Sequence, residues 1–170
     1  MSLNMKSFAS TNKSGFTLIE ALIATVLIGV TVAALITSNI SHTQANAHGM
    51  HTSTAEFLID QIRAMSMPMD FVDPEQSGVT FGTEDGESGV SDFDDLDDFD
   101  GVTFNPPVDV SGNSLSDFSA YSQVITVESV DPADFTGTVD DFDSSIIRMT
   151  VDIFMNGKEV GSRSWIKTQK

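Results

Sequence analysis

The residues best placed to do chemistry form an acidic run near the middle of the chain. Six of the nine residues from 92 to 100 are aspartates: Asp92, Asp94, Asp95, Asp97, Asp98 and Asp100. Oxygen-rich surroundings suit Ca²⁺, which takes about six to eight oxygen ligands, several of them from carboxylates. The run departs from the helix–loop–helix calcium pattern, whose first position falls on Leu96 and whose bidentate glutamate position falls on Pro107. One hypothesis is therefore a looser calcium site that uses Asp94, Asp95, Asp97, Asp98 and Asp100.

The sequence favours a second hypothesis for this run, a solvated acidic loop. So many like charges oppose packing into a regular helix or strand, while Phe93, Leu96 and Phe99 recur at every third position. We expect these apolar side chains to hold the loop on the domain while the carboxylates face the solvent. Asp–Phe pairs occur six times, ending at Phe71, Phe93, Phe99, Phe118, Phe135 and Phe142, and we expect the same arrangement at each.

The rest of the sequence shows no catalytic constellation. It contains no cysteine, which excludes disulfides, zinc–thiolate sites and thiol nucleophiles. The motifs of phosphate-binding loops, serine-hydrolase elbows and zinc proteases are also missing. The 25 acidic residues against 8 basic ones give a net charge of −17, which argues against nucleic-acid binding because phosphate contacts need clustered Lys and Arg. We therefore expect a protein without enzymatic activity, with calcium as the one cofactor considered.

One carboxylate, Glu20, interrupts the apolar segment 16–40, which is 25 residues long. A helix of this length extends about 37 Å and can cross roughly 30 Å of hydrocarbon. A carboxylate within such a helix costs about 2.5–3.5 kcal/mol on insertion scales, so its presence indicates a function. Lys6 and Lys13 precede the segment, and the positive-inside rule therefore predicts a cytoplasmic N-terminus.

The string Lys13-Ser14-Gly15-Phe16-Thr17-Leu18-Ile19-Glu20, followed by about twenty apolar residues, resembles the N-terminus of type IV prepilin-like proteins. That family includes pilins, minor pilins and the pseudopilins of type II secretion. The resemblance covers about the first 40 residues. It implies cleavage after Gly15 by a prepilin peptidase, N-methylation of Phe16, and pairing of Glu20 with the N-terminal amine of a neighbouring subunit during assembly.

The chain also departs from many major pilins in two respects. It has no Pro between Phe16 and Met67, and it lacks the C-terminal cysteine pair. These differences favour a minor subunit or a pseudopilin. Removal of residues 1–15, which carry two lysines and no acid, changes the net charge from −17 to −19. Such an acidic surface favours cations as ligands.

The sequence predicts four segments. They are a leader (1–15), a transmembrane and assembly helix (16–40), an amphipathic continuation of that helix (41–67) and a globular head (68–170). A stripe at helical spacing predicts which side chains of the continuation pack on the head: Ala47, Met50, Thr54, Leu58, Ile62 and Met65. Pro68 ends the helix.

The C-terminus predicts an antiparallel hairpin. Ile147, Met149, Val151 and Ile153 alternate with other residues and are expected in the core, and Asn156-Gly157 is typical of a two-residue type I′ turn. This turn predicts pairing of Ile153 with Val160, and places Arg148 opposite Trp165 as a cation–π pair. A third strand is expected at 121–130, which gives an α+β fold with the helix across one face of the sheet.

We expect from these observations a structural subunit of a type IV pilus-like or type II secretion pseudopilus filament. Its partners would be other pilin-like subunits, the prepilin peptidase and an inner-membrane assembly platform. It would cross the bacterial inner membrane once, with its head outside the cytoplasm, before it enters the filament. The alternative is a membrane-tethered binding module that captures Ca²⁺ or a cationic ligand in its acidic loop.

Overall fold

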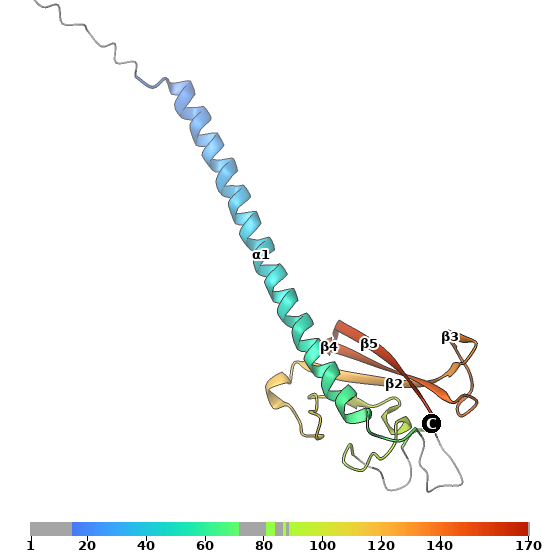
Figure 1. Ribbon diagram of the computed structural model, residues 1–170. Coiled ribbons are helices and arrows are strands. Elements are labelled where there is room, and N and C mark those ends of the chain that lie inside the picture. The colour runs from blue at the N-terminus through green and yellow to red at the C-terminus, as the bar shows by residue number, and fades with distance from the viewer. Residues whose placement is uncertain (1–14, 72–80, 84–86, 88, 170) are drawn as a thin grey trace, which may run out of the picture. The chain divides into compact units, whose positions relative to one another are not determined.

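A long helix followed by a small antiparallel sheet makes up the fold (Figure 1), so the predicted α+β class is confirmed. The computed structural model describes residues 15–71, 81–83, 87 and 89–169. The chain divides into two compact units, residues 1–46 and residues 47–170. The first contains the N-terminal part of the helix, and the second contains the rest of the helix and the sheet.

Helix α1 extends over Leu18–Ser66, or 49 residues, so it starts two residues later and ends one residue earlier than the predicted helix. Within residues 18–40 its large apolar side chains are exposed to the surroundings, from 49% at Val32 to 84% at Leu18. Hydroxyl groups along this part donate to backbone carbonyls of the preceding turn, as Thr25 does to Leu22 and Thr31 does to Ile28, each at 2.8 Å. A helix with such internally bonded hydroxyls is compatible with an apolar surrounding.

In the unit formed by residues 47–170, one face of α1 is buried. Its buried residues are Ala55, Leu58, Ile59, Ile62, Met65 and Ser66. The predicted stripe is therefore correct for Leu58, Ile62 and Met65, but it is wrong for Met50, which is 66% exposed. Apolar spacing alone could not show that close packing begins only near Ala55.

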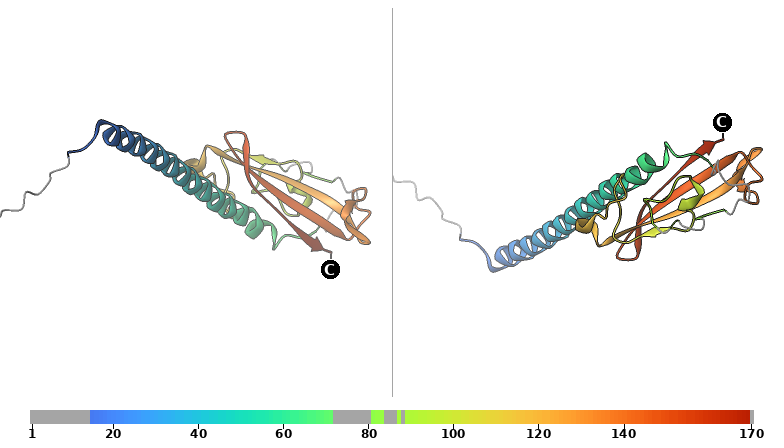
Figure 2. Two further views of the ribbon diagram at one scale, coloured as in Figure 1. Left: turned by 90° about the horizontal axis from the view of Figure 1, so that it is seen from above. Right: turned by 90° about the horizontal axis from the view of Figure 1, so that it is seen from below.

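The strands are β1 (Thr103–Phe104), β2 (Tyr121–Asp131), β3 (Asp134–Thr138), β4 (Ile146–Met155) and β5 (Lys158–Thr168). Their order is β1-β2-β4-β5, with β3 also paired to β2, and every pairing is antiparallel. Strands β1 and β3 were not predicted. Asp131-Pro132 had indicated the end of a strand, whereas the chain turns here and β3 returns along β2. Both views of Figure 2 show the green end of α1 beside the orange and red strands.

The C-terminal hairpin turns at Asn156-Gly157, where both residues have positive φ angles of 49° and 78°, as the sequence predicted. The four expected core residues of β4, Ile147, Met149, Val151 and Ile153, are at most 2% exposed. The predicted register is wrong, however. An irregularity between Ile153 and Phe154 shifts β5 by one residue, so that Ile153 pairs with Gly161 instead of Val160. A β-bulge of this kind leaves one extra residue unpaired and changes which side chains face the helix.

The shifted register brings small and charged residues of β5 against α1. A Cβ atom at Gly161 would lie 2.7 Å from Cβ of Ala55, so only glycine allows this approach. The guanidinium of Arg163 pairs with Glu56 and lies 3.8 Å from Asp60.

The predicted Arg148–Trp165 pair is also wrong. Arg148 instead bonds Glu128 of β2 at 2.8 Å, and the guanidinium over the Trp165 ring, at 5.9 Å, comes from Arg63 of α1. The one-residue shift explains this difference, since Trp165 now pairs with Met149.

A fully buried amide joins three parts of the head. The Gln123 side chain on β2 donates to the carbonyl oxygens of Leu58 in α1 and of Val108 in the loop between β1 and β2, at 3.0 and 3.2 Å. It also accepts a bond of 2.8 Å from the Val108 N–H. Because one buried side chain satisfies three backbone groups, it fixes the helix, the strand and the loop together.

Candidate functional sites

The expected processing point lies directly before α1. Phe16 is 84% exposed, and apart from the adjoining residues no described atom lies within 4 Å of the position that a Cβ at Gly15 would occupy. The predicted cleavage after Gly15 and the methylation of Phe16 remain predictions.

The carboxylate of Glu20 lies in the first turn of α1 and has a partner there. Its Oε2 atom accepts bonds of 3.2 Å from both the backbone N–H and the hydroxyl of Thr17. In return, the N–H of Glu20 donates to Oγ1 of Thr17 at 3.3 Å. This reciprocal arrangement is a capping box, and the pattern Thr-x-x-Glu before an apolar run was the signal that could have identified it. Thr17 was missed as a partner of Glu20.

The acidic run 92–100 is not solvated throughout, which corrects the favoured prediction. Asp95, Asp97 and Asp98 are at most 2% exposed. The reason is the insertion of Leu96 and Phe99 into the core, at 2% and 0% exposure. The 3₁₀ helix η1 (Asp97–Phe99) follows Leu96 directly and ends at Phe99, and its two aspartates are buried with these anchors.

The general expectation for Asp–Phe pairs holds only in part. Phe71 and Phe99 are buried, and Phe93 and Phe118 pack against the core. The expectation is wrong for Phe135 and Phe142, which are 54% and 37% exposed.

Each of the three buried carboxylates has one bonded oxygen. Oδ1 of Asp95 accepts from the N–H groups of Asp97 and Asp98 at 3.1 and 3.4 Å. Oδ2 of Asp97 accepts from the Gly82 N–H at 3.3 Å. Oδ2 of Asp98 accepts from the Asp94 and Asp95 N–H groups at 3.0 and 3.4 Å. The side chains are therefore oriented by the main chain.

The second oxygen of each carboxylate is different. Oδ2 of Asp95, Oδ1 of Asp97 and Oδ1 of Asp98 are buried and have no hydrogen-bond partner in the described part of the chain. Leaving a buried charged group without a partner is costly, because it has lost its hydration. Three such atoms lie within four consecutive residues, and a proton or a cation on these carboxyl groups would compensate their charge.

Burial changes the acidity of this group. It raises the pKa of Asp97 from 3.8 to about 8, with further contributions from the adjacent Asp95 carboxyl. Burial and the adjacent Glu87 carboxyl likewise raise the pKa of Asp98 from 3.8 to about 7. Pairs of carboxyl groups held this close resist simultaneous ionisation near neutral pH.

Glu87, Asp94 and Asp98 form a cluster in which one carboxylate oxygen from each lies within 4.8 Å of the other two. Sequence reasoning missed Glu87, which precedes the acidic run. It had included Asp100, but Oδ1 of Asp100 accepts a 2.9 Å bond from the Val127 N–H and thereby attaches the loop to β2. Asp100 is not part of the cluster.

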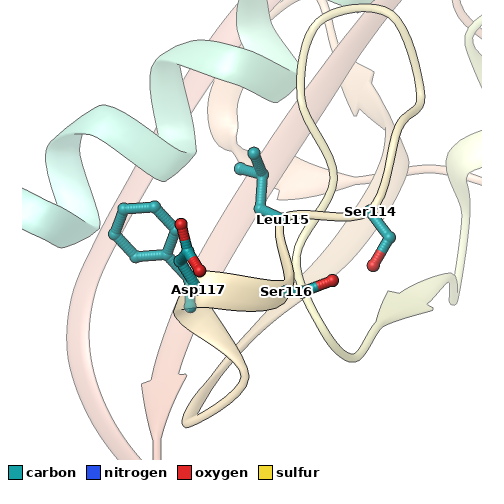
Figure 3. Close-up of a pocket in the computed structure, with 5 residues that line it drawn as sticks. Ser114, Leu115, Ser116 and Asp117 are labelled. Carbon is teal, nitrogen blue, oxygen red and sulfur yellow. The ribbon is translucent and has the colours of Figure 1, made fainter.

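A pocket of about 280 Å³ lies elsewhere, on the loop that contains the 3₁₀ helix η2 (Ser116–Phe118). Its lining residues are Ser114, Leu115, Ser116, Asp117 and Phe118 (Figure 3). In Figure 3 the hydroxyls of Ser114 and Ser116 point away from the Asp117 carboxylate. These five residues do not form a nucleophile–base pair.

The fold and the N-terminal segment define a class of protein, a small α+β domain that follows a membrane-anchoring helix. Among the described residues, α1 is the one helix long and apolar enough to cross a membrane. Residues 10–36 match the family model described as the prokaryotic N-terminal methylation motif. The chain thus carries the signature of type IV prepilin-like proteins. Comparison with curated proteins and with solved structures found no match.

Proposed function

We propose that this chain is a structural subunit of a type IV pilus-like or pseudopilus filament, rather than an enzyme, and that it is a minor subunit. The observation that carries the proposal is the exposed apolar surface of α1 within residues 18–40, with one carboxylate in its first turn. Such a surface is stable in a bilayer, and packing against the same surface of other subunits would also remove it from water. The methylation motif at residues 10–36 supports the same function.

Processing would supply the partner that Glu20 needs in the filament. In the unprocessed chain, the bonds from Thr17 occupy one oxygen of the Glu20 carboxylate. Cleavage after Gly15 by a prepilin peptidase would create a cationic amine on Phe16. A neighbouring subunit displaced along the filament axis could present its own Phe16 amine to Glu20, and pairing of two charges recovers much of the free energy lost on burial.

The proposed location follows from the same segment. Residues 16–40 would span the inner membrane with residues 1–15 in the cytoplasm, residues 41–67 would continue the helix, and the head (68–170) would lie outside. The assembly platform would move the processed subunit from the membrane into the filament. This proposal needs no nucleic acid and no catalytic group.

The test combines intact mass and filament composition. Protein extracted from the membrane should have the mass of residues 16–170 plus one methyl group. In cells, the Glu20→Gln variant should accumulate in the membrane at the normal level, while its share in sheared filaments falls at least about tenfold. Thr31→Val is a matched control, because it changes an internally bonded hydroxyl of the same helix and should leave incorporation unchanged.

The alternative of a membrane-tethered binding module predicts different results. A simple tether would keep Lys13 and would be found only in the membrane. An N-terminus at Met1, or unchanged filament incorporation of Glu20→Gln, would contradict the processing or the assembly role, respectively.

A further inference from the structure

We propose that the acidic run and Glu87 bind one calcium ion, with Asp98 as the central ligand and Glu87 and Asp94 as the flanking ligands. The site goes beyond the filament function and does not depend on it. It differs from the set predicted by composition, because Glu87 joins the ligands, Asp100 leaves them, and Asp95 and Asp97 are not direct ligands.

The buried Asp98 carboxylate has one bonded oxygen and one oxygen without a partner. Its Oδ2 atom is held by two backbone N–H groups, and its Oδ1 atom is fully buried without a hydrogen-bond partner among the described residues. The carboxylate is thus fixed in orientation before any ligand arrives. A bound cation would satisfy Oδ1 and would remove the cost of a buried, uncompensated charge.

The carboxylates of Glu87 and Asp94 lie close to that of Asp98. Oxygen atoms of Glu87, Asp94 and Asp98 lie within 4.8 Å of one another. Ca²⁺ lies about 2.3–2.6 Å from each of its oxygen ligands. One ion can therefore bridge two oxygens that are up to about 5 Å apart. Like charges do not gather this closely in a folded chain unless a proton or a cation compensates them.

Asp95 and Asp97 lie between the proposed ligands Asp94 and Asp98 in the sequence. Each also presents one buried oxygen without a partner. The pair lies in the same segment as Asp98 and adds two further carboxyl groups beside the three proposed ligands. We assign these two residues to the surroundings of the ion, where they raise its affinity without binding it directly.

The donor chemistry selects the ion. All the ligands are carboxylate oxygens, which suit hard cations and offer nothing to metals that prefer sulfur or imidazole. Mg²⁺ requires near-ideal octahedral geometry at about 2.0–2.1 Å and retains its water shell. A cluster of three carboxylates on irregular loop residues suits the flexible coordination of Ca²⁺ better.

The ion would hold together residues that lie in different parts of the chain. Glu87 precedes the acidic run, whereas Leu96 and Phe99 anchor the run in the core and Asp100 attaches it to β2. Binding would therefore join Glu87 to Asp94 and Asp98 of the acidic run. We expect calcium to raise the thermal unfolding temperature of the head, because an ion that binds only the folded form stabilises that form.

The test uses the full chain, extracted from membranes in a non-ionic detergent and freed of divalent cations with a chelator. Titration calorimetry with CaCl₂ should give one site with a Kd of about 10⁻³ M or lower. The thermal unfolding temperature, followed by the fluorescence of Trp165, should rise with calcium and should rise less with magnesium. Asp98→Asn should weaken calcium binding by about 10–100-fold and abolish the shift in unfolding temperature.

Two further groups of variants make the result specific. Glu87→Gln and Asp94→Asn should each weaken binding at least about tenfold, and Asp95→Asn and Asp97→Asn should weaken it less. Asp92→Asn removes the same charge from an exposed position of the same run and should change the affinity by less than about threefold. Trp165 fluorescence without calcium verifies that each variant is folded.

Either of two outcomes would overturn the proposal. One is the absence of calcium binding and of any thermal shift at millimolar calcium in the wild-type chain. The other is binding that Asp92→Asn weakens as much as Asp98→Asn does, because that result would mean diffuse attraction to an acidic surface.

Discussion

Two aspartate-containing loops of the head place the same side chain in opposite surroundings. Asp109 is partly exposed, and its carboxylate accepts bonds from the N–H groups of Ser111 and Asn113 and from the Asn113 amide. These bonds, led by the Asn113 backbone N–H, lower the pKa of Asp109. Asp97 and Asp98 also accept from main-chain N–H groups, yet burial raises their pKa values. Main-chain N–H groups that bond only one oxygen of a buried carboxyl group therefore do not compensate for the loss of hydration of its ionised form.

The largest expected effect comes from a carboxylate placed in the core without any N–H donor arranged for it. Val151 in β4 is fully buried, and Val151→Asp should lower the free energy of unfolding by about 3–5 kcal/mol. The measurement is urea unfolding of the full chain in detergent, followed by Trp165 fluorescence. Thr150→Asp changes the adjacent, partly exposed residue and should cost less than about 1 kcal/mol. Equal losses would show that burial does not decide the cost.

An intermediate effect is expected from neutralising a buried aspartate. Between its ordinary pKa of 3.8 and its raised pKa of about 8, Asp97 stays protonated in the folded head and ionises in the unfolded chain. In the chelator, the stability of the head should therefore fall as the pH rises from about 4 to about 8. Asp97→Asn should reduce this slope and stabilise the cation-free protein at pH 8 by about 1–3 kcal/mol. An unchanged slope would mean that Asp97 is not the group responsible.

The smallest effect is expected at the partly exposed loop, and it has the opposite dependence on pH. The pKa of Asp109 is lowered, so its contribution is present above the ordinary value near 3.8 and is lost as the pH falls through the lowered pKa. Asp109→Ala should lower the urea midpoint slightly at pH 7, and the difference should disappear in strong acid. A loss as large as that of Val151→Asp would contradict the distinction between the two loops.

The sequence was sufficient for features set by local chemistry. The apolar run and Pro68 predicted the helix to within two residues at its start, and Asn156-Gly157 predicted the turn of the hairpin. It was not sufficient for the register of β5, because strict alternation carries no sign of the irregularity beside Ile153. That shift decided which residues of β5 reach α1.

In the candidate sites too, some features could be predicted from the sequence and others could not. Composition identified the acidic run, but only the tertiary fold could bring Glu87 beside Asp98. Nor could composition show that η1 turns Asp97 and Asp98 toward the interior. Thr17 is a different case, since its spacing to Glu20 is a local signal that the sequence already contained.

The buried amide of Gln123 has a mechanical consequence for the proposed role as a filament subunit. Its bonds to Leu58 and Val108 hold α1, β2 and a loop at one relative position. Sliding the helix by about 1 Å would stretch the bond to Leu58 beyond hydrogen-bonding distance, and an equivalent carbonyl would reach the same place only after about one turn, 5.4 Å. Tension applied along α1 would therefore load this joint in shear, and the head should resist pulling up to a threshold force and then release the helix abruptly.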